Sequence, residues 1–147
     1  MSRIAFQTAM RAGCVQLLED YKAAVMTLKL QIYPGRPRSI NPPCAFVDGI
    51  HETITYTGLM VQRRPLAEIV VLHGLFDSKD TVDQRDAFVD GFMDWAIDQI
   101  HAANANTTIG LVEVQDEPTF VPDWLPPEEQ KTYYATRLSL EGLSLSG

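Results

Sequence analysis

Apolar residues recur at steps of three, four and seven along residues 81–103, and the rest of the chain is organised around this stretch. An α-helix brings such positions onto one face, so the spacing predicts one amphipathic helix from Thr81 to Ala103. The segments on both sides of it have strand-like patterns, and the apolar face should therefore pack on a sheet. That face consists of Phe88, Phe92, Trp95, Ala96 and Ala103, widened by Val89, Met93, Ile97 and Ile100.

The same helix carries a row of four aspartates, called here the acidic ridge: Asp86, Asp90, Asp94 and Asp98. Four-residue steps place their carboxylates one above the next, where like charges cost roughly a few tenths of a kcal/mol per pair. Two interpretations stay open. The ridge is either a solvated face or a wall that repels something negative.

Gly91 lies in the middle of this helix, where glycine costs about 1 kcal/mol relative to alanine. Such a glycine suggests that another part of the structure approaches the helix closely. We expect the neighbour to be a strand or another chain.

Other apolar patterns predict one more helix and four strands. The helix runs from Arg3 to Lys29. Residues 58–65 are expected to form a turn or hairpin tip, and residues 77–80 a break before the main helix. The predicted strands are Cys44–Thr57, Leu66–Phe76, Thr108–Gln115 and Thr132–Leu143, and the second is the most apolar and therefore central. The sequence thus predicts a single α+β domain over residues 1–147, with a four-stranded, mostly antiparallel sheet packed by two main helices.

The segment Tyr33–Pro43 contains four prolines, which exclude helix and central strand alike. It should be an ordered, extended connection. Its Arg36 and Arg38 either lie exposed on this loop or meet acidic partners.

A proline-rich arm is expected at residues 117–131, where four prolines in Glu117–Gln130 argue against regular structure. Phe120 and Trp124 are too apolar for a solvated linker, so another surface should cover them. The arm either folds back over its own domain or docks on another subunit, where a tryptophan is a typical anchor.

The charge is unevenly distributed along the chain. The total is −7, but residues 1–64 hold eight Lys/Arg and four Asp/Glu, a balance of +4, and residues 65–147 hold four and fifteen, a balance of −11. An acidic total argues against sequence-independent nucleic-acid binding. A bipolar chain can instead bring a basic face of one copy to an acidic face of the next, as in a head-to-tail ring.

Motifs for catalysis, metals or cofactors are absent from the sequence. HETIT at 51–55 lacks the second histidine of a zinc-binding HExxH helix, and His73 in an apolar strand is expected to be a hydrogen-bonded core residue. Phosphate-binding glycine loops and a GxSxG nucleophile motif are also missing. The sequence therefore predicts a protein that is not an enzyme, with no catalytic residue, metal or cofactor.

Targeting signals are missing as well, since the N-terminal residues do not resemble a secretory signal and no apolar run approaches 18 residues. Cys14 and Cys44 share no metal or redox spacing and are expected to be buried thiols. We therefore expect a protein made in the cytoplasm that does not enter a membrane.

The chain resembles the tail terminator (tail completion) proteins of long-tailed bacteriophages over most of its length. Four segments carry the resemblance: IYPGRPRSINPPCAFVDGI at 32–50, RRPLAEIVVLHGLFDSKD at 63–80, RDAFVDGFMDWAIDQIHAA at 85–103 and TYYATRLSLEGL at 132–143. None of them is a chemical signature. Stopper and connector proteins of the phage neck share the size and the α+β style, so a neck adaptor that binds the portal side is the alternative.

The resemblance implies a small α/β domain that forms a hexameric ring on the tail tube, halts tube polymerisation and makes the joint to the head. The implied partners are further copies of the chain, the tail-tube protein and a head-completion or connector protein, and DNA passes through without specific binding. The implied location is the head-proximal end of the tail in the virion. On this interpretation the acidic ridge faces the channel, and the candidate subunit or partner interface is Arg36, Arg38, Phe120 and Trp124.

Overall fold

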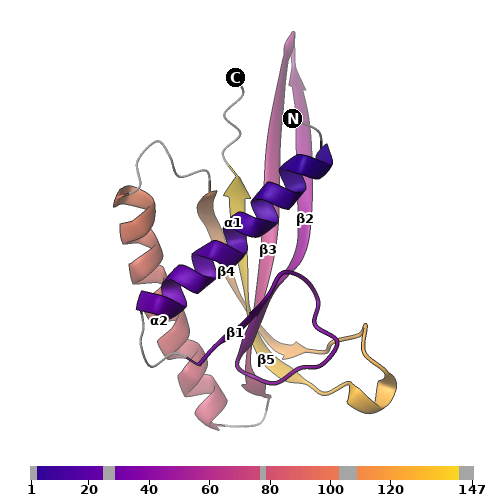
Figure 1. Ribbon diagram of the computed structural model, residues 1–147, viewed down its shortest axis with the longest axis vertical. Helices are drawn as coiled ribbons and strands as arrows, with labels where there is room; N and C mark the ends of the chain where they lie inside the picture. The colour runs from indigo at the N-terminus through magenta and orange to yellow at the C-terminus, as the bar shows by residue number, and fades with distance from the viewer. Residues whose placement is uncertain (1–2, 25–28, 77–78, 103–108, 143–147) are drawn as a thin grey trace.

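The computed structural model describes residues 3–24, 29–76, 79–102 and 109–142. These residues form helices packed against one sheet, with a long hairpin that extends from one end (Figure 1). The elements are α1 Arg3–Ala24, β1 Gln31–Tyr33, β2 Cys44–Thr57, β3 Met60–Leu75, α2 Lys79–Ala102, β4 Ile109–Phe120, η2 Pro127–Glu129 and β5 Tyr133–Gly142.

The sheet has the strand order β1-β2-β3-β5-β4. β1 runs parallel to β2, and the other neighbours are antiparallel, so the sheet is mixed. The α+β class with two main helices is confirmed, but the expected four strands are wrong because β1 is a fifth. β1 has only three residues and Pro34 follows it directly, so its sequence is too short to show a strand pattern.

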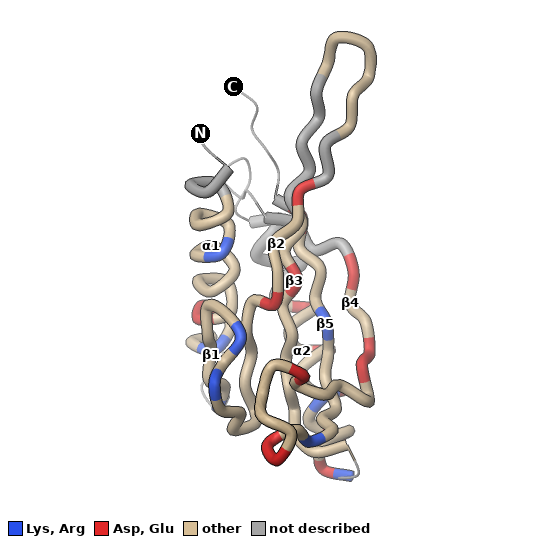
Figure 2. Tube along the Cα trace, turned by 90° about the vertical axis from the view of Figure 1, so that its right-hand side faces the viewer, with Lys and Arg blue, Asp and Glu red and all other residues tan. Residues whose placement is uncertain are grey.

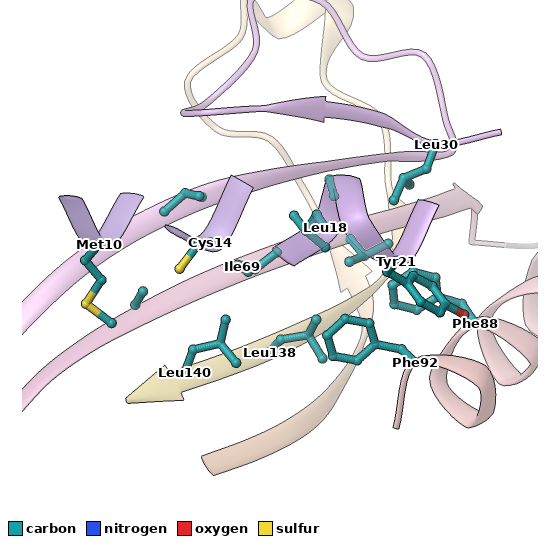
Figure 3. Packing of buried hydrophobic residues seen from close by; sticks show 14 residues of the cluster. Met10, Cys14, Leu18, Tyr21, Leu30, Ile69, Phe88, Phe92, Leu138 and Leu140 are labelled. Carbon is teal, nitrogen blue, oxygen red and sulfur yellow. The ribbon is translucent and has the colours of Figure 1, made fainter. Parts of the chain in front are cut away.

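Both helices contribute to one continuous apolar core on one face of the sheet. Tyr21 of α1 packs edge-on against both Phe88 and Phe92 of α2, with ring centroids 5.5 and 5.3 Å away. Figure 3 shows Phe92 beside Leu138 of β5, and Tyr21 next to Phe88. The expected apolar stripe of α2 is confirmed at its described positions. The buried residues of this core are Met10, Cys14, Leu18, Tyr21, Leu30, Ala45, Val47, Ala67, Ile69, Val71, Phe88, Phe92, Leu138 and Leu140.

A smaller apolar cluster lies on the other face of the sheet. Side chains alternate between the two faces of a strand, so Phe46 points away from its neighbours Ala45 and Val47, which belong to the main core. Four side chains from outside the centre of the sheet pack on this cluster: Tyr33, Ile40, Phe120 and Trp124. Both faces of the central strands are therefore covered in the lower part of the sheet.

The upper parts of β2 and β3 form a two-stranded ribbon, called here the hairpin arm, which consists of residues 52–65. The last pair between β3 and β5 is Leu66 with Glu141, and the last pair between β1 and β2 is Tyr33 with Phe46. Beyond these pairs, the described strands of the arm pair only with each other (Figure 1). The expected turn or hairpin tip at residues 58–65 is found but is shorter than expected, because the turn has only two residues and Met60 already starts β3.

The proline-rich arm is more regular than expected. β4 continues to Phe120 across Pro118, and η2 forms a short 3-10 helix at Pro127–Glu129. A register shift between Glu117 and Phe120 accommodates the proline, which has no N–H to donate to the sheet. The expectation that prolines exclude regular structure throughout Glu117–Gln130 is therefore wrong at both ends of the segment.

The helix ends also differ from expectation. Lys29 is not helical, whereas residues 25–28, where α1 was expected to continue, lie outside the described part of the chain. α2 begins at Lys79, inside the expected break at residues 77–80. It is described as far as Ala102, close to the expected end.

Gly91 marks the close approach that the sequence indicates, but the neighbour is a helix of the same chain. A Cβ atom at position 91 would lie 2.7 Å from the Tyr21 hydroxyl of α1. Gly74 has the same role in β3, since a Cβ there would lie 2.5 Å from the hydroxyl oxygen of the buried Thr81 of α2. Glycine at these two positions lets α2 pack tightly against α1 and β3.

Candidate interaction surfaces

Trp124 holds residues 120–130 against their own domain. Its indole Nε1 donates a hydrogen bond of 2.8 Å to the carbonyl oxygen of Pro37, and its ring packs edge-on to Phe46 at a centroid distance of 5.3 Å. The Arg36 guanidinium carbon lies 5.0 Å from the centre of the indole. Phe120 completes the group at 6.0 Å from Trp124. The sequence left two arrangements of the proline-rich arm open. In the structure this arm folds back on its own chain.

The four candidate interface residues are thus only partly brought together. Arg36, Phe120 and Trp124 meet in one cluster, whereas Arg38 lies exposed on the connection that carries Arg36. Trp124 is half-buried by contacts within the chain. A role of this cluster in binding another subunit stays a prediction.

An ionic cluster continues from Arg36 across the sheet. Its centre is Arg137 of β5, whose guanidinium forms two hydrogen bonds with Glu117 of β4, the shorter of 2.6 Å. One further nitrogen of Arg137 lies 2.7 Å from Glu68 of β3 and 3.0 Å from Asp48 of β2. Arg36 binds the second oxygen of Asp48 at 2.8 Å. The cluster therefore links four strands and the loop through two arginines and three carboxylates.

The electrostatics of this cluster suit a structural role. The bidentate contact with Glu117 is the main cause of the raised pKa of Arg137. Burial alone would raise the pKa of Asp48, but hydrogen bonds from Arg36 and Arg137 outweigh it and lower that pKa. A carboxylate held ionised in this way is poorly suited to give or take a proton near neutral pH. The cluster joins strands and offers no obvious acid or base.

The acidic ridge lies on the exposed side of α2, opposite Phe88 and Phe92. Asp86, Asp90 and Asp94 are exposed, and Asp98 falls within the helix at a position whose side chain lies outside the described part of the chain. Arg85 lies 2.9 Å from Asp86, which neutralises part of the charge at the start of the ridge. The exposed position agrees with both interpretations of the ridge.

Arg85 also joins α2 to β4. Its Nε lies 2.5 Å from a carboxylate oxygen of Asp116, an ion pair whose angles do not meet those of a hydrogen bond, so this buried Nε has no hydrogen-bond partner. Asp116 also accepts a hydrogen bond of 3.1 Å from Tyr134. These contacts fasten the first turns of α2 to the outer strand of the sheet.

The buried histidine and the two buried cysteines are uncharged at neutral pH. His73 is 4% exposed and lies 2.8 Å from the hydroxyl of Thr136, as expected of a core histidine. Burial, reinforced by Arg85, lowers its pKa to about 4, so the ring is neutral at pH 7. Burial raises the pKa of both Cys14 and Cys44 to about 11, which keeps them as thiols. Within the described ranges, no cluster of three metal-ligating side chains occurs and no helix could cross a bilayer.

The length of the hairpin arm is the feature of the surface that the sequence did not predict. The tip of the arm exposes three large apolar side chains: Tyr56 and Met60 are each 75% exposed, and Leu59 is fully exposed. The alternation of residues 53–57 and the glycine at position 58 were visible signals of a hairpin, but RRP at 63–65 indicated a loop. Pro65 is compatible with a strand here because, among the described strands, β3 pairs only with β2 at that point. A proline is tolerated on a strand whose other edge has no partner strand.

Comparisons with protein-family models and with curated proteins gave no match for this chain.

Proposed function

We propose that this chain is a structural assembly protein of a long-tailed bacteriophage that caps the tail tube as a hexameric ring. In this role it stops tube polymerisation and forms the interface with the head. The resemblance of four sequence segments supplies the identity of the assembly. The hairpin arm is the single structural observation that best supports a function through protein contacts.

The arm needs a contact outside its own domain for two physical reasons. A two-stranded ribbon is marginally stable in water without a third strand or a packed face. Its tip also keeps three large apolar side chains, Tyr56, Leu59 and Met60, in solvent, and large exposed apolar side chains grouped at one end of a molecule are typical of a binding site. The domain below it has covered faces and linked strands, so it is a firm base for such an arm.

The acidic ridge supports the channel part of the proposal. Three of its carboxylates are exposed along one side of α2, and DNA that slides through a ring must not be held by it. Negative side chains repel phosphates and keep DNA from binding the wall. The ridge is assigned to the wall of the channel on this ground.

The direct test combines purified protein with tail-tube subunits. Native mass spectrometry should find a six-subunit assembly in the presence of tube, and electron microscopy should show shorter tubes with one capped end. Tubes of unchanged length together with a strict monomer at all concentrations would overturn the proposal. Binding to a portal or head-connector protein, with no effect on tubes, would favour the neck adaptor instead.

Removal of the charges of the acidic ridge, compared with a matched control, tests whether the ridge faces the channel. The triple change of Asp86, Asp90 and Asp94 to Asn should make the assembled ring retain duplex DNA at low salt, because three repulsive charges are removed. The control changes Glu113, Glu128 and Glu129 to Gln, which removes the same charge from exposed positions elsewhere. Equal DNA retention by both variants in a filter-binding measurement would remove the ridge from the channel.

A further inference from the structure

An open hollow lies at the end of the molecule opposite the hairpin arm. It has a volume of about 560 Å³ and is lined by Leu75, Phe76, Thr119, Val121 and Thr132. Three of these side chains are large, apolar and exposed: Leu75 by 50%, Phe76 by 40% and Val121 by 42%. A backbone hydrogen bond of 3.1 Å from Phe76 to Thr132 holds the two sides of the hollow together.

The tip of the arm is narrow and carries exposed apolar side chains. Gly58 and Leu59 form the turn, with Gly58 at φ 61°, a left-handed conformation that glycine adopts without strain. Tyr56 and Met60 flank Leu59, so three apolar side chains gather at the end of a narrow ribbon.

Tip and hollow cannot meet within one chain. Met60 and Leu75 are the first and last residues of β3, which has 16 residues. At about 3.3 Å per residue, the two ends of this strand lie roughly 50 Å apart. Figure 1 shows the tip and the lower end of β3 at opposite ends of the molecule.

We propose that the tip of the hairpin arm of one copy docks into this hollow on the next copy. The tip and the hollow both expose apolar side chains, and burial of these side chains would stabilise the contact. This contact would join neighbouring subunits of the proposed ring, and its place in a closed ring rests on the proposed function.

Charge complementarity favours a second copy as the occupant. The arm, residues 52–65, holds two arginines and one glutamate, a balance of +1. Residues 116–132, which contribute three of the five lining positions, hold five acidic residues and one lysine. Asp116 and Glu117 are paired with Arg85 and Arg137, so the other three acidic residues and the lysine give a balance of −2. Figure 2 shows acidic positions along β4 and on the loop below it. The uneven charge of the sequence thus becomes an attraction between opposite ends of neighbouring copies.

A contact between different surfaces of identical chains has a geometric consequence. An open series of copies keeps one free tip at one end and one free hollow at the other, so the assembly is a ring where the rotation between copies permits and a filament where it does not. The arm therefore sets the direction in which subunits follow one another.

Cross-linking between two variants, each with one added cysteine on its surface, tests the contact. Leu59→Cys and Val121→Cys proteins, mixed and oxidised with copper phenanthroline, should form a disulfide-linked pair that contains one chain of each variant. The control mixture is Leu59→Cys with Gln84→Cys, an exposed position on α2. Cys14 and Cys44 are buried and should stay reduced. Equal yields of mixed pairs in both mixtures would overturn the proposal.

Self-association of charge variants separates this proposal from the proposed function. Leu59→Asp and Val121→Asp should each weaken self-association at least tenfold in sedimentation, because a charge would enter an apolar contact. Leu59→Asp combined with Val121→Lys in the same chain should recover part of it. Unchanged urea midpoints would show that the domain itself is intact.

Each outcome decides between the two ideas. Leu59→Asp rings that form normally and cap tubes would overturn the docking contact and leave the proposed function standing. Loss of tube capping with unchanged self-association would assign the tip to the tube protein and overturn the second copy as occupant. Wild-type self-association through the arm without any effect on tubes would support the contact and contradict the terminator role.

Discussion

The two halves of β2 and β3 follow the same strand geometry and have opposite surroundings. In the lower half, Val47 and Ile69 are almost completely buried between neighbouring strands and helices. In the upper half, Tyr56 and Met60 belong to the same ladder and are each 75% exposed. The backbone pairing of β2 with β3 continues through both halves, so strand pairing alone does not determine which side chains are buried. The apolar side chains of the upper half are best understood as a surface for another protein.

The largest predicted difference between the two halves is the cost of removing an apolar side chain. Phe92→Ala, in the core beneath the lower half, should lower the free energy of unfolding by about 3–5 kcal/mol because it leaves a cavity. Leu59→Ala at the tip should change it by less than about 0.5 kcal/mol. Urea unfolding of both variants measures the difference, and a loss of several kcal/mol at Leu59 would show that the arm packs on its own domain.

The second prediction concerns pH and the two histidines of these strands. The pKa of His73 is about 4 in the folded protein and about 6.5 when exposed, so between these values the unfolded chain binds a proton that the folded chain does not. Its contribution to stability is therefore lost as pH falls from about 6.5 to about 4, by at most about 3 kcal/mol.

His73→Gln should flatten the dependence of the urea midpoint on pH in this interval, because glutamine does not titrate. The control is His51→Gln, an exposed position near the base of the arm, which should keep the wild-type profile. Identical profiles for His73→Gln and the wild type would contradict a neutral, buried His73.

The third prediction compares the buried and exposed arginines of the ionic cluster. Arg137→Met should cost about 2–3 kcal/mol, somewhat less than for a fully buried pair, because its three carboxylates would lose their partner while keeping some access to water. Arg36→Met should cost about 1 kcal/mol, since this side chain is half exposed. Adding Glu68→Gln and Glu117→Gln to Arg137→Met should recover part of the loss in thermal unfolding. No recovery would mean that the arginine acts through packing alone.

The smallest effect is expected where α1 and α2 touch. Gly91→Ala should destabilise the protein by about 1 kcal/mol, because the clash with Tyr21 exceeds the gain in helix propensity. In a Tyr21→Phe background the clash is removed, and the same change should stabilise by up to about 1 kcal/mol. A double-mutant cycle by urea unfolding measures this change of sign. Equal effects in both backgrounds would mean that the contact with the Tyr21 hydroxyl does not limit position 91.

Local patterns predicted those parts of the fold that long, regular segments encode. The apolar face of α2, the central position of β3 and the core role of His73 follow from spacing and hydrophobicity. The sequence also indicated a close approach at Gly91, but it could not show that Tyr21, seventy residues away, is the neighbour. Contacts between distant segments leave little trace in either segment alone.

The surfaces were harder to predict for the same reason. β1 is defined by its parallel partner β2 and not by its own three residues. The hairpin arm was hidden by Arg63, Arg64 and Pro65, which resemble a loop until the ends of the neighbouring strands are known. The choice between the two positions of Trp124 depended on whether Pro37 and Phe46 were within reach, which only the folded chain reveals.

The outer edge of β4 is irregular, which affects how readily the sheet could pair with a strand of another molecule. Among the described residues this outermost strand pairs only with β5, which leaves backbone groups along one side free to recruit any passing strand. Two register shifts, Pro118 and a series of charges at Glu113, Asp116 and Glu117 make that margin irregular and hard to extend. A protein crowded among identical copies would otherwise risk fusing sheet to sheet into amyloid-like aggregates. In the proposed ring, the irregular margin would leave the subunits to meet only through contacts that can be undone and corrected.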